Sequence, residues 1–111
     1  MKSPLVSVIV PTKNSSRTLE ACLQSVKDQT YRELEMIVVD NFSSDTTPDI
    51  ARRFTEKFFS KGPERSYQRN FAVEQARGEY VFIIDSDMRL EPGVIDECVE
   101  QMGGKGVVGV I

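Results

Sequence analysis

Two aspartates separated by one serine, Asp85 and Asp87, are the residues of this chain best suited to chemistry. They follow residues 80–84, a short run of β-branched and aromatic residues that is typical of a strand buried on both faces. Carboxylates at the end of such a strand can hold Mg²⁺ or Mn²⁺ together with phosphate oxygens, since both cations prefer oxygen ligands. A solvated turn is the alternative, because a chain with 17 acidic residues contains such pairs by chance.

Two earlier segments have the same composition as residues 80–84. Residues 5–10 and 34–39 are apolar runs followed by Pro11–Thr12 and by Asp40, and proline is expected to end the first strand because it cannot donate to a ladder. Apolar residues at helical spacing predict helices over about 17–28, from 48 to the late fifties, from 66 to 77 and from 91 to 102. Short strands are expected near 58–59 and over 107–111.

This alternation of strands and helices predicts an α/β fold with a mostly parallel sheet and helices on both faces. The 111 residues are enough for a single domain and few for two. In a parallel sheet the carboxyl ends of the strands lie along one edge, where ligands bind. We therefore expect Thr12, Asp40, Asp85 and Asp87 to converge on one crevice.

Polar residues near the predicted helix ends are expected to satisfy unpaired backbone groups. The side chains of residues 14–16 are expected to cap the first helix, Asp45 the second and Ser66 the third. Gly78 is expected to end the third helix in the left-handed conformation. Arg65 and Arg69 are expected on the solvated face of that helix, although a guanidinium could also reach a base or a diphosphate.

The composition excludes several classes of function. A net charge of -3, a pI near 5.0 and scattered basic residues argue against a nucleic-acid partner. The chain has no histidine and only two cysteines, so a histidine base and a zinc site built on these residue types are excluded. Cys22 and Cys98 are expected to be small buried residues in a reducing, cytoplasmic setting. No apolar segment is long enough to cross a bilayer.

The order of the motifs resembles family 2 glycosyltransferases of the GT-A fold. The segments that carry the resemblance are residues 6–14, 25–31, 37–45, 69–70, 78–80 and 85–87. The resemblance covers nearly the whole chain and implies a Rossmann-like nucleotide-diphospho-sugar transferase fold, of which this chain would be a part. It also implies transfer of a sugar from a nucleotide-sugar donor to an acceptor with a divalent metal, Mn²⁺ or Mg²⁺.

The resemblance further implies roles for individual residues. The donor-binding set is Pro11, Thr12, Asn14, Asp40, Arg69 and Asp85, and the metal-binding set is Asp87 with Asp85. Pro11 and Thr12 would line the nucleoside pocket, and Asp40 would hydrogen-bond the base, often uracil. Arg69 would lie against the base or the phosphates. Asp85 would face the ribose or the metal shell, and Asp87 would ligate the metal.

The resemblance also implies an incomplete enzyme. The family is usually inverting and takes its general base, an Asp or Glu, from the half that follows the donor domain. We therefore expect residues 1–111 to be the N-terminal, donor-binding half of a chain that continues after Ile111 and to be inactive in transfer alone. A UDP-sugar is favoured over a GDP-sugar, and the acceptor, whether sugar, lipid or protein, stays open.

Two expectations concern the surroundings of the protein. The apolar strand over 107–111 would expose an edge unless the chain continues or a second copy covers it, so self-association through this strand is expected in the second case. A polyprenyl-phosphate acceptor would place the full-length protein at the cytoplasmic face of the membrane.

Two other functions are compatible with the residues. A sugar nucleotidyltransferase also uses a parallel sheet and Mg²⁺ held by acids, but it ordinarily has a glycine-rich, basic turn after the first strand, where this chain has residues 11–14, Pro-Thr-Lys-Asn. A non-catalytic nucleotide-binding or interaction module would keep the fold without the chemistry. Metal-dependent binding of nucleotide sugars would distinguish a transferase from such a module.

Overall fold

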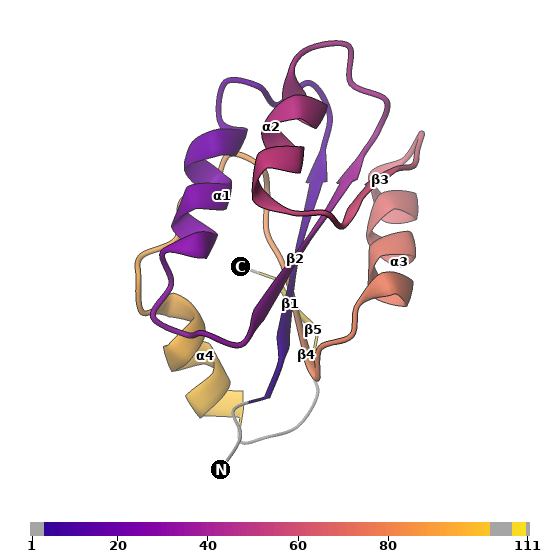
Figure 1. The fold of residues 1–111 in the computed structure, drawn as a ribbon. Helices are drawn as coiled ribbons and strands as arrows, with labels where there is room; N and C mark the ends of the chain where they lie inside the picture. The colour runs from indigo at the N-terminus through magenta and orange to yellow at the C-terminus, as the bar shows by residue number, and fades with distance from the viewer. Residues whose placement is uncertain (1–3, 103–107, 111) are drawn as a thin grey trace.

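The computed structural model describes residues 4–102 and 108–110. Within them, five parallel strands form one sheet in the order β3-β2-β1-β4-β5 (Figure 1). The strands are β1 (Val6–Thr12), β2 (Leu34–Asp40), β3 (Phe58–Ser60), β4 (Tyr80–Ile83) and β5 (Val108–Val110). The helices are α1 (Leu19–Lys27), α2 (Thr47–Phe54), α3 (Arg65–Gln75) and α4 (Val94–Met102). The predicted α/β class is confirmed.

Helices cover both faces of the sheet, as Figure 1 shows. On one face lie α1, α2 and α4, where Ile50 and Ile95 belong to the same core cluster as Val8 of β1. On the other face lies α3, whose Ala72 packs in a second cluster with Ile9 of β1. Successive residues of a strand point to opposite faces, so a strand between two cores is mainly apolar, as β1 is apart from Ser7 and Thr12.

The chain changes direction across the sheet at β1. It moves from β1 to β2 and β3 with α1 and α2 on one face, and then returns through α3, on the opposite face, to β4 on the other side of β1. Right-handed crossovers require this change of face. The carboxyl ends of β1 and β4 therefore form the switch point at which open α/β sheets bind their ligands.

The first strand runs two residues further than the sequence predicts, through Pro11 and Thr12. Its pairing with β4 stops at Ile9, whereas its pairing with β2 continues to Thr12. The carbonyl of Ile9 faces β4 and accepts the N–H of Ile84 at 3.0 Å. The nitrogen of Pro11, two residues later, lies on that same side, where β4 no longer pairs. The prediction that Pro11 ends the strand is wrong because no ladder hydrogen bond is lost there.

The predicted caps of α1 and α3 are also wrong. The N-cap residues are Thr18 and Glu64, and neither makes a side-chain capping hydrogen bond. The polar side chains of residues 14 and 15 bind neighbouring loops instead. Asp45, in contrast, accepts the backbone N–H of Thr47 in the first turn of α2 at 2.9 Å, so its predicted capping role is confirmed.

A glycine is needed at position 78 for a different reason from the one predicted. Helix α3 ends at Gln75 with Ala76 as its C-cap, so Gly78 does not end it. A Cβ on Gly78 would lie 2.6 Å from the hydroxyl oxygen of Ser7 and 2.8 Å from the carbonyl oxygen of Leu5. Glycine is therefore needed for the close approach of this segment to β1, and its N–H donates to the Ser7 hydroxyl at 2.8 Å.

Both cysteines are free thiols. Cys22 is fully buried, as predicted, and Cys98 is half-buried against the same core cluster. Of the predicted strand 107–111, residues 107 and 111 lie outside the described residues. No helix in the part of the chain that the structure describes combines the length and the apolar character needed to cross a membrane.

Candidate functional site

A cavity of about 260 Å³ opens at the carboxyl ends of the central strands. Its walls come from the end of β1 and the loop after it, the loop after β2, the start of α3, and the turn after β4. The lining residues are Pro11, Thr12, Lys13, Ser15, Asn41, Pro63, Arg65, Gln68 and Ser86. The sequence prediction of a crevice at this edge of the sheet thus corresponds to a cavity at the switch point.

A buried hydrogen-bonded pair joins β1 to β2 behind this cavity. Asp40 is 1% exposed, and its Oδ1 accepts the hydroxyl of Thr12 at 2.6 Å. Ser43 donates its hydroxyl to the same oxygen at 2.6 Å and its backbone N–H to Oδ2 at 2.8 Å. Both carboxylate oxygens of Asp40 are therefore engaged by the protein, and the residue fixes the positions of Thr12 and of the loop after β2.

Gln68 of α3 holds the same strand ends from the other face of the sheet. Its side chain is 4% exposed, and its amide nitrogen donates to the carbonyl oxygens of Thr12 at 3.0 Å and of Val39 at 2.8 Å. These two carbonyls belong to neighbouring strands, so one side chain fixes the spacing of β1 and β2 where the cavity begins. The start of α3, which also lines the cavity, is fixed by the same contacts.

The loops after β1 and β2 are tied together. Asn14 accepts the N–H of Ser44 at 2.8 Å and donates its own N–H to the Ser43 hydroxyl at 2.7 Å. Lys13 donates its ammonium to the carbonyl of Asn41 at 2.8 Å. The side-chain amide of Asn41 in turn donates to the carbonyl of Pro63 at 2.7 Å. Through these bonds three segments distant in sequence share one wall of the cavity.

The turn that carries the two aspartates is held by its backbone and by Ser86. The Asp85 carbonyl accepts the N–H of Met88 at 3.0 Å and the thiol of Cys22 at 3.6 Å. The hydroxyl of Ser86 lies 2.9 Å from that of Ser15. These contacts leave the carboxylates of Asp85 and Asp87 on the exposed side of the turn, where they can meet a ligand without disturbing the core.

Arg65, at the first position of α3, forms an ion pair with Asp85. Both side chains are about half exposed, at 54% and 56%. Arg65 is exposed, as expected for a solvated helix face, but its guanidinium also extends from the cavity wall to the aspartate turn. A cationic group thus already lies against the first carboxylate of the pair.

The donor atoms of this turn suit a divalent cation. Asp85 and Asp87 offer carboxylate oxygens, the ligands that Mn²⁺ and Mg²⁺ prefer, and the guanidinium of Arg65 marks a place where positive charge is stabilised. Among the described residues no group of three or more His, Cys, Asp or Glu side chains could hold a metal by itself. Such a turn fits a cation that takes its other ligands from a bound phosphate and from water.

Two groups near this edge have shifted pKa values. Burial raises the pKa of the Cys22 thiol to about 12, and the negative charge of Asp87 adds to the shift, so the thiol is a weak donor and not a nucleophile. Hydrogen bonds from Thr47 lower the pKa of Asp45 to about 2, with a further contribution from Ser16. Asp45 therefore stays ionised as a link between the start of α2 and the loop after β1.

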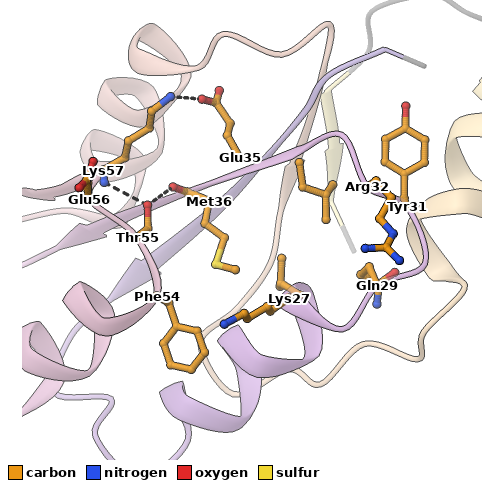
Figure 2. A pocket seen from close by; sticks show the side chains of 12 residues that line it. Lys27, Gln29, Tyr31, Arg32, Glu35, Met36, Phe54, Thr55, Glu56 and Lys57 are labelled. Carbon is orange, nitrogen blue, oxygen red and sulfur yellow. Dashed lines mark hydrogen bonds and ion pairs between the residues drawn. The ribbon is translucent and has the colours of Figure 1, made fainter. Parts of the chain in front are cut away.

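A larger cavity, about 490 Å³, lies at the opposite edge of the sheet (Figure 2). It is formed by the end of α1, the start of β2 and the segment after α2, with Met36 and Phe54 among its apolar residues. Figure 2 shows Lys57 and Glu35 bonded to each other on its rim. Parallel sheets bind ligands at their carboxyl edge, so we assign the chemistry to the smaller cavity.

Six of the seven predicted site residues fall into three groups. Pro11 and Thr12 line the cavity. Buried Asp40 and exposed Asn14 do not line it but brace the loops around it, and Asp85 and Asp87 lie beside it on the turn that contributes Ser86. Half-buried Arg69 is not among the lining residues.

The lining residues that are absent from the predicted site set are Lys13, Ser15, Asn41, Pro63, Arg65, Gln68 and Ser86. For Arg65 the sequence had suggested contact with a base or a diphosphate as an alternative, and Gln68 also carried a signal. Gln68 precedes Ala72 and Ala76 at helical spacing, so a polar side chain stands on the core-facing stripe of α3.

Residues 7–111 match a family model described as "Glycosyl transferase family 2". The chain belongs to this family. Glycosyltransferase AglE of Haloferax volcanii is 34% identical over 113 residues, which cover 94% of this chain and 37% of AglE. The chain spans roughly a third to two fifths of the length of several curated relatives that it matches.

Two solved structures have the same fold as this chain. S. aureus TarS in complex with UDP-GlcNAc superposes with a TM-score of 0.75 and 29% identity, over 93% of this chain and 36% of TarS. The mannosyltransferase PcManGT of Pyrobaculum calidifontis, in complex with GDP-Man and Mn²⁺, gives a TM-score of 0.71 and 33% identity over 80% of this chain and 29% of PcManGT. The predicted GT-A glycosyltransferase fold is thereby confirmed for this part of the protein.

Proposed function

We propose that this chain binds the nucleotide-diphospho-sugar donor of a glycosyltransferase in the cavity at the carboxyl ends of β1, β2 and β4. The observation that carries the proposal is that buried Asp40 and Gln68 hold the ends of β1 and β2 beside a turn with two exposed carboxylates. Two structural neighbours, TarS and PcManGT, were solved with UDP-GlcNAc and with GDP-Man and Mn²⁺, which supports this class of ligand.

The nucleoside would lie against Pro11, Thr12 and Asn41, which line the cavity. Asn41 is the better candidate for a direct contact to the base, because both oxygens of Asp40 already accept hydrogen bonds from Thr12 and Ser43. Asp40 would then act on the base indirectly, by fixing Thr12. Half-buried Arg69 would reach the base or the phosphates only after its side chain turns towards the cavity. We favour a UDP-sugar over a GDP-sugar.

The diphosphate would lie next to the turn formed by residues 85–87. Asp87 and Asp85 would hold Mn²⁺ or Mg²⁺ together with phosphate oxygens, which agrees with the small number of protein ligands at this turn. The cation would offset the negative charge that develops on the nucleoside diphosphate as the sugar leaves. The chain's own contribution is to hold the two carboxylates on a turn whose backbone is fixed by Met88, Cys22 and Ser15.

The acceptor would be activated by a carboxylate outside the donor site. Asp40 is buried and hydrogen-bonded, and Asp85 and Asp87 would be neutralised by the metal, so none of these three could serve as the base of an inverting transfer. We propose that the base and the acceptor site lie in the part of the protein that corresponds to the remaining length of the relatives. This chain alone would then bind the donor without transferring its sugar.

Calorimetric titration of the chain with UDP, UDP-GlcNAc and GDP-mannose, each with and without Mn²⁺, tests the proposal. We expect binding that requires Mn²⁺ and that Asp87→Asn abolishes. Asp49→Asn on α2 is the matched control, since Asp49 is an exposed acid in a surface ion pair with Arg52 and does not line the cavity. Binding of none of these nucleotides, or binding that is indifferent to both Mn²⁺ and Asp87, would refute the proposed function.

A further inference from the structure

The ion pair between Arg65 and Asp85 places a guanidinium where a metal ion would bind. Arg65 lines the cavity from the first position of α3, and Asp85 is the first carboxylate of the turn after β4. The pair crosses from one wall of the cavity to the proposed metal turn. A guanidinium and a divalent cation on the same carboxylate would repel each other strongly, because their charges would lie only a few ångströms apart.

The backbone on each side of this ion pair is fixed, so only the side chains can rearrange. Three residues after Arg65, Gln68 anchors α3 to the carbonyls of β1 and β2. On the other side, Met88 and Ser15 hold the aspartate turn. Arg65 itself is about half exposed, and its long side chain can leave Asp85 without any movement of the helix.

We propose that Arg65 exchanges partners when the donor binds: it neutralises Asp85 in the free protein and moves to the diphosphate when a divalent cation takes its place. This inference rests on the proposed donor-binding function and adds a positioning residue to it. A guanidinium suits both partners, since it forms bidentate hydrogen bonds with carboxylates and with phosphates. The cavity wall keeps it within reach of both.

The exchange makes metal binding depend on the nucleotide. Without the nucleotide, the cation must displace Arg65 from Asp85 and leave the guanidinium unpaired. With the nucleotide, the displaced guanidinium gains a diphosphate, so the same displacement becomes favourable. Arg65 thereby contributes to the coupling between the two ligands, and this coupling is reciprocal: the metal must strengthen nucleotide binding by the same factor.

The variant Arg65→Gln tests this exchange, with Mn²⁺ affinity measured calorimetrically in the absence and in the presence of saturating UDP. Without UDP, we expect Mn²⁺ to bind about two- to fivefold more tightly to the variant, the range set by an exposed ion pair. In Mn²⁺, we expect UDP to bind at least about fivefold more weakly, because a charge-assisted contact is lost. Without Mn²⁺, Arg65 stays on Asp85 and UDP affinity should not change, so the coupling factor, which is the ratio of the Mn²⁺ affinities with and without UDP, should fall by the same factor of at least about five.

The matched control is Arg53→Gln, which removes an arginine of similar exposure from the surface pair with Glu20 on the α1–α2 side. It should leave both affinities and the coupling factor unchanged. A static effect of the lost charge would alter Mn²⁺ affinity equally with and without UDP, so an unchanged coupling factor in Arg65→Gln would overturn the exchange. Failure of the unsubstituted chain to bind UDP would instead overturn the proposed function itself.

Discussion

Gln68→Glu is the substitution that probes most directly how the sheet builds its ligand edge. The new side chain has the same shape but replaces an amide that donates to two carbonyls, those of Thr12 and Val39. A neutral carboxyl can donate to only one of them, and an ionised carboxyl to neither. Since Gln68 is 4% exposed, water cannot replace the lost bonds. The neutral form should therefore cost about 1 kcal/mol of folding free energy from one lost hydrogen bond.

The ionised form of the introduced carboxyl should cost far more. Burial against two carbonyl oxygens raises its pKa in the folded protein above the value near 4.3 of the unfolded chain. With a raised folded pKa, the neutral carboxyl is tolerated at low pH, and stability is lost as the pH rises above about 4. The loss reaches about 1.4 kcal/mol per pH unit, or up to about 3.7 kcal/mol at pH 7 if the group stays neutral in the fold.

Urea unfolding of the variant and the unsubstituted chain at several pH values from 4 to 7 measures this difference. The control is Gln75→Glu at the exposed end of the same helix, which should change stability by no more than about 0.5 kcal/mol. The variant should also lose UDP affinity because the ends of β1 and β2 separate. A difference in unfolding free energy that is small and independent of pH would refute the role assigned to Gln68.

Three further predictions concern other parts of the fold. Gly78→Ala should lower the unfolding free energy by about 1–3 kcal/mol, because its Cβ would lie 2.6 Å from the Ser7 hydroxyl oxygen. The control is Gly93→Ala, whose Cβ would have nothing within 4 Å. Equal losses of unfolding free energy in the two variants would contradict the packing argument. The pKa of Asp45 is lowered to about 2, so the stability that its charge provides is present above about pH 4 and lost between about pH 4 and 2. The difference in melting temperature between the unsubstituted chain and Asp45→Asn should therefore shrink across that range. A difference that stays constant would contradict the stabilising role of the charge. Because burial raises the pKa of Cys22 to about 12, peptide mapping should find it unlabelled by iodoacetamide at pH 8 in the native protein, and rapid labelling would show that the site opens.

The sequence predicts the strand ends well because their signals are local. Short apolar runs rich in β-branched residues identify buried strands wherever they occur. The rule that parallel strands share one carboxyl edge then brings Thr12, Asp40 and Asp85 to one region without any knowledge of side-chain packing. The same reasoning extends to the short edge strand β3, expected near 58–59 and found at Phe58–Ser60.

The helix caps and the cavity walls could not be predicted in the same way. Asn14 and Ser15 have the composition of a cap, but their partners Ser44 and Ser86 come from loops 30 and 71 residues away. Side chains that could cap locally therefore brace the site instead. Arg65 has the sequence surroundings of a solvated residue, and only the three-dimensional approach of α3 to the turn after β4 gives it a partner.

The measurement that tests the central claim most directly is the paramagnetic broadening of backbone amide signals when Mn²⁺ is added to the ¹⁵N-labelled chain with UDP. The account predicts that the amides of Ser86 and Asp87 disappear first. The amide of Leu34, at the opposite end of β2 and about 20 Å from the ligand edge by strand geometry, should keep its signal. Broadening that is centred elsewhere, or that is the same without UDP, would contradict a metal–nucleotide site at the carboxyl ends of these strands.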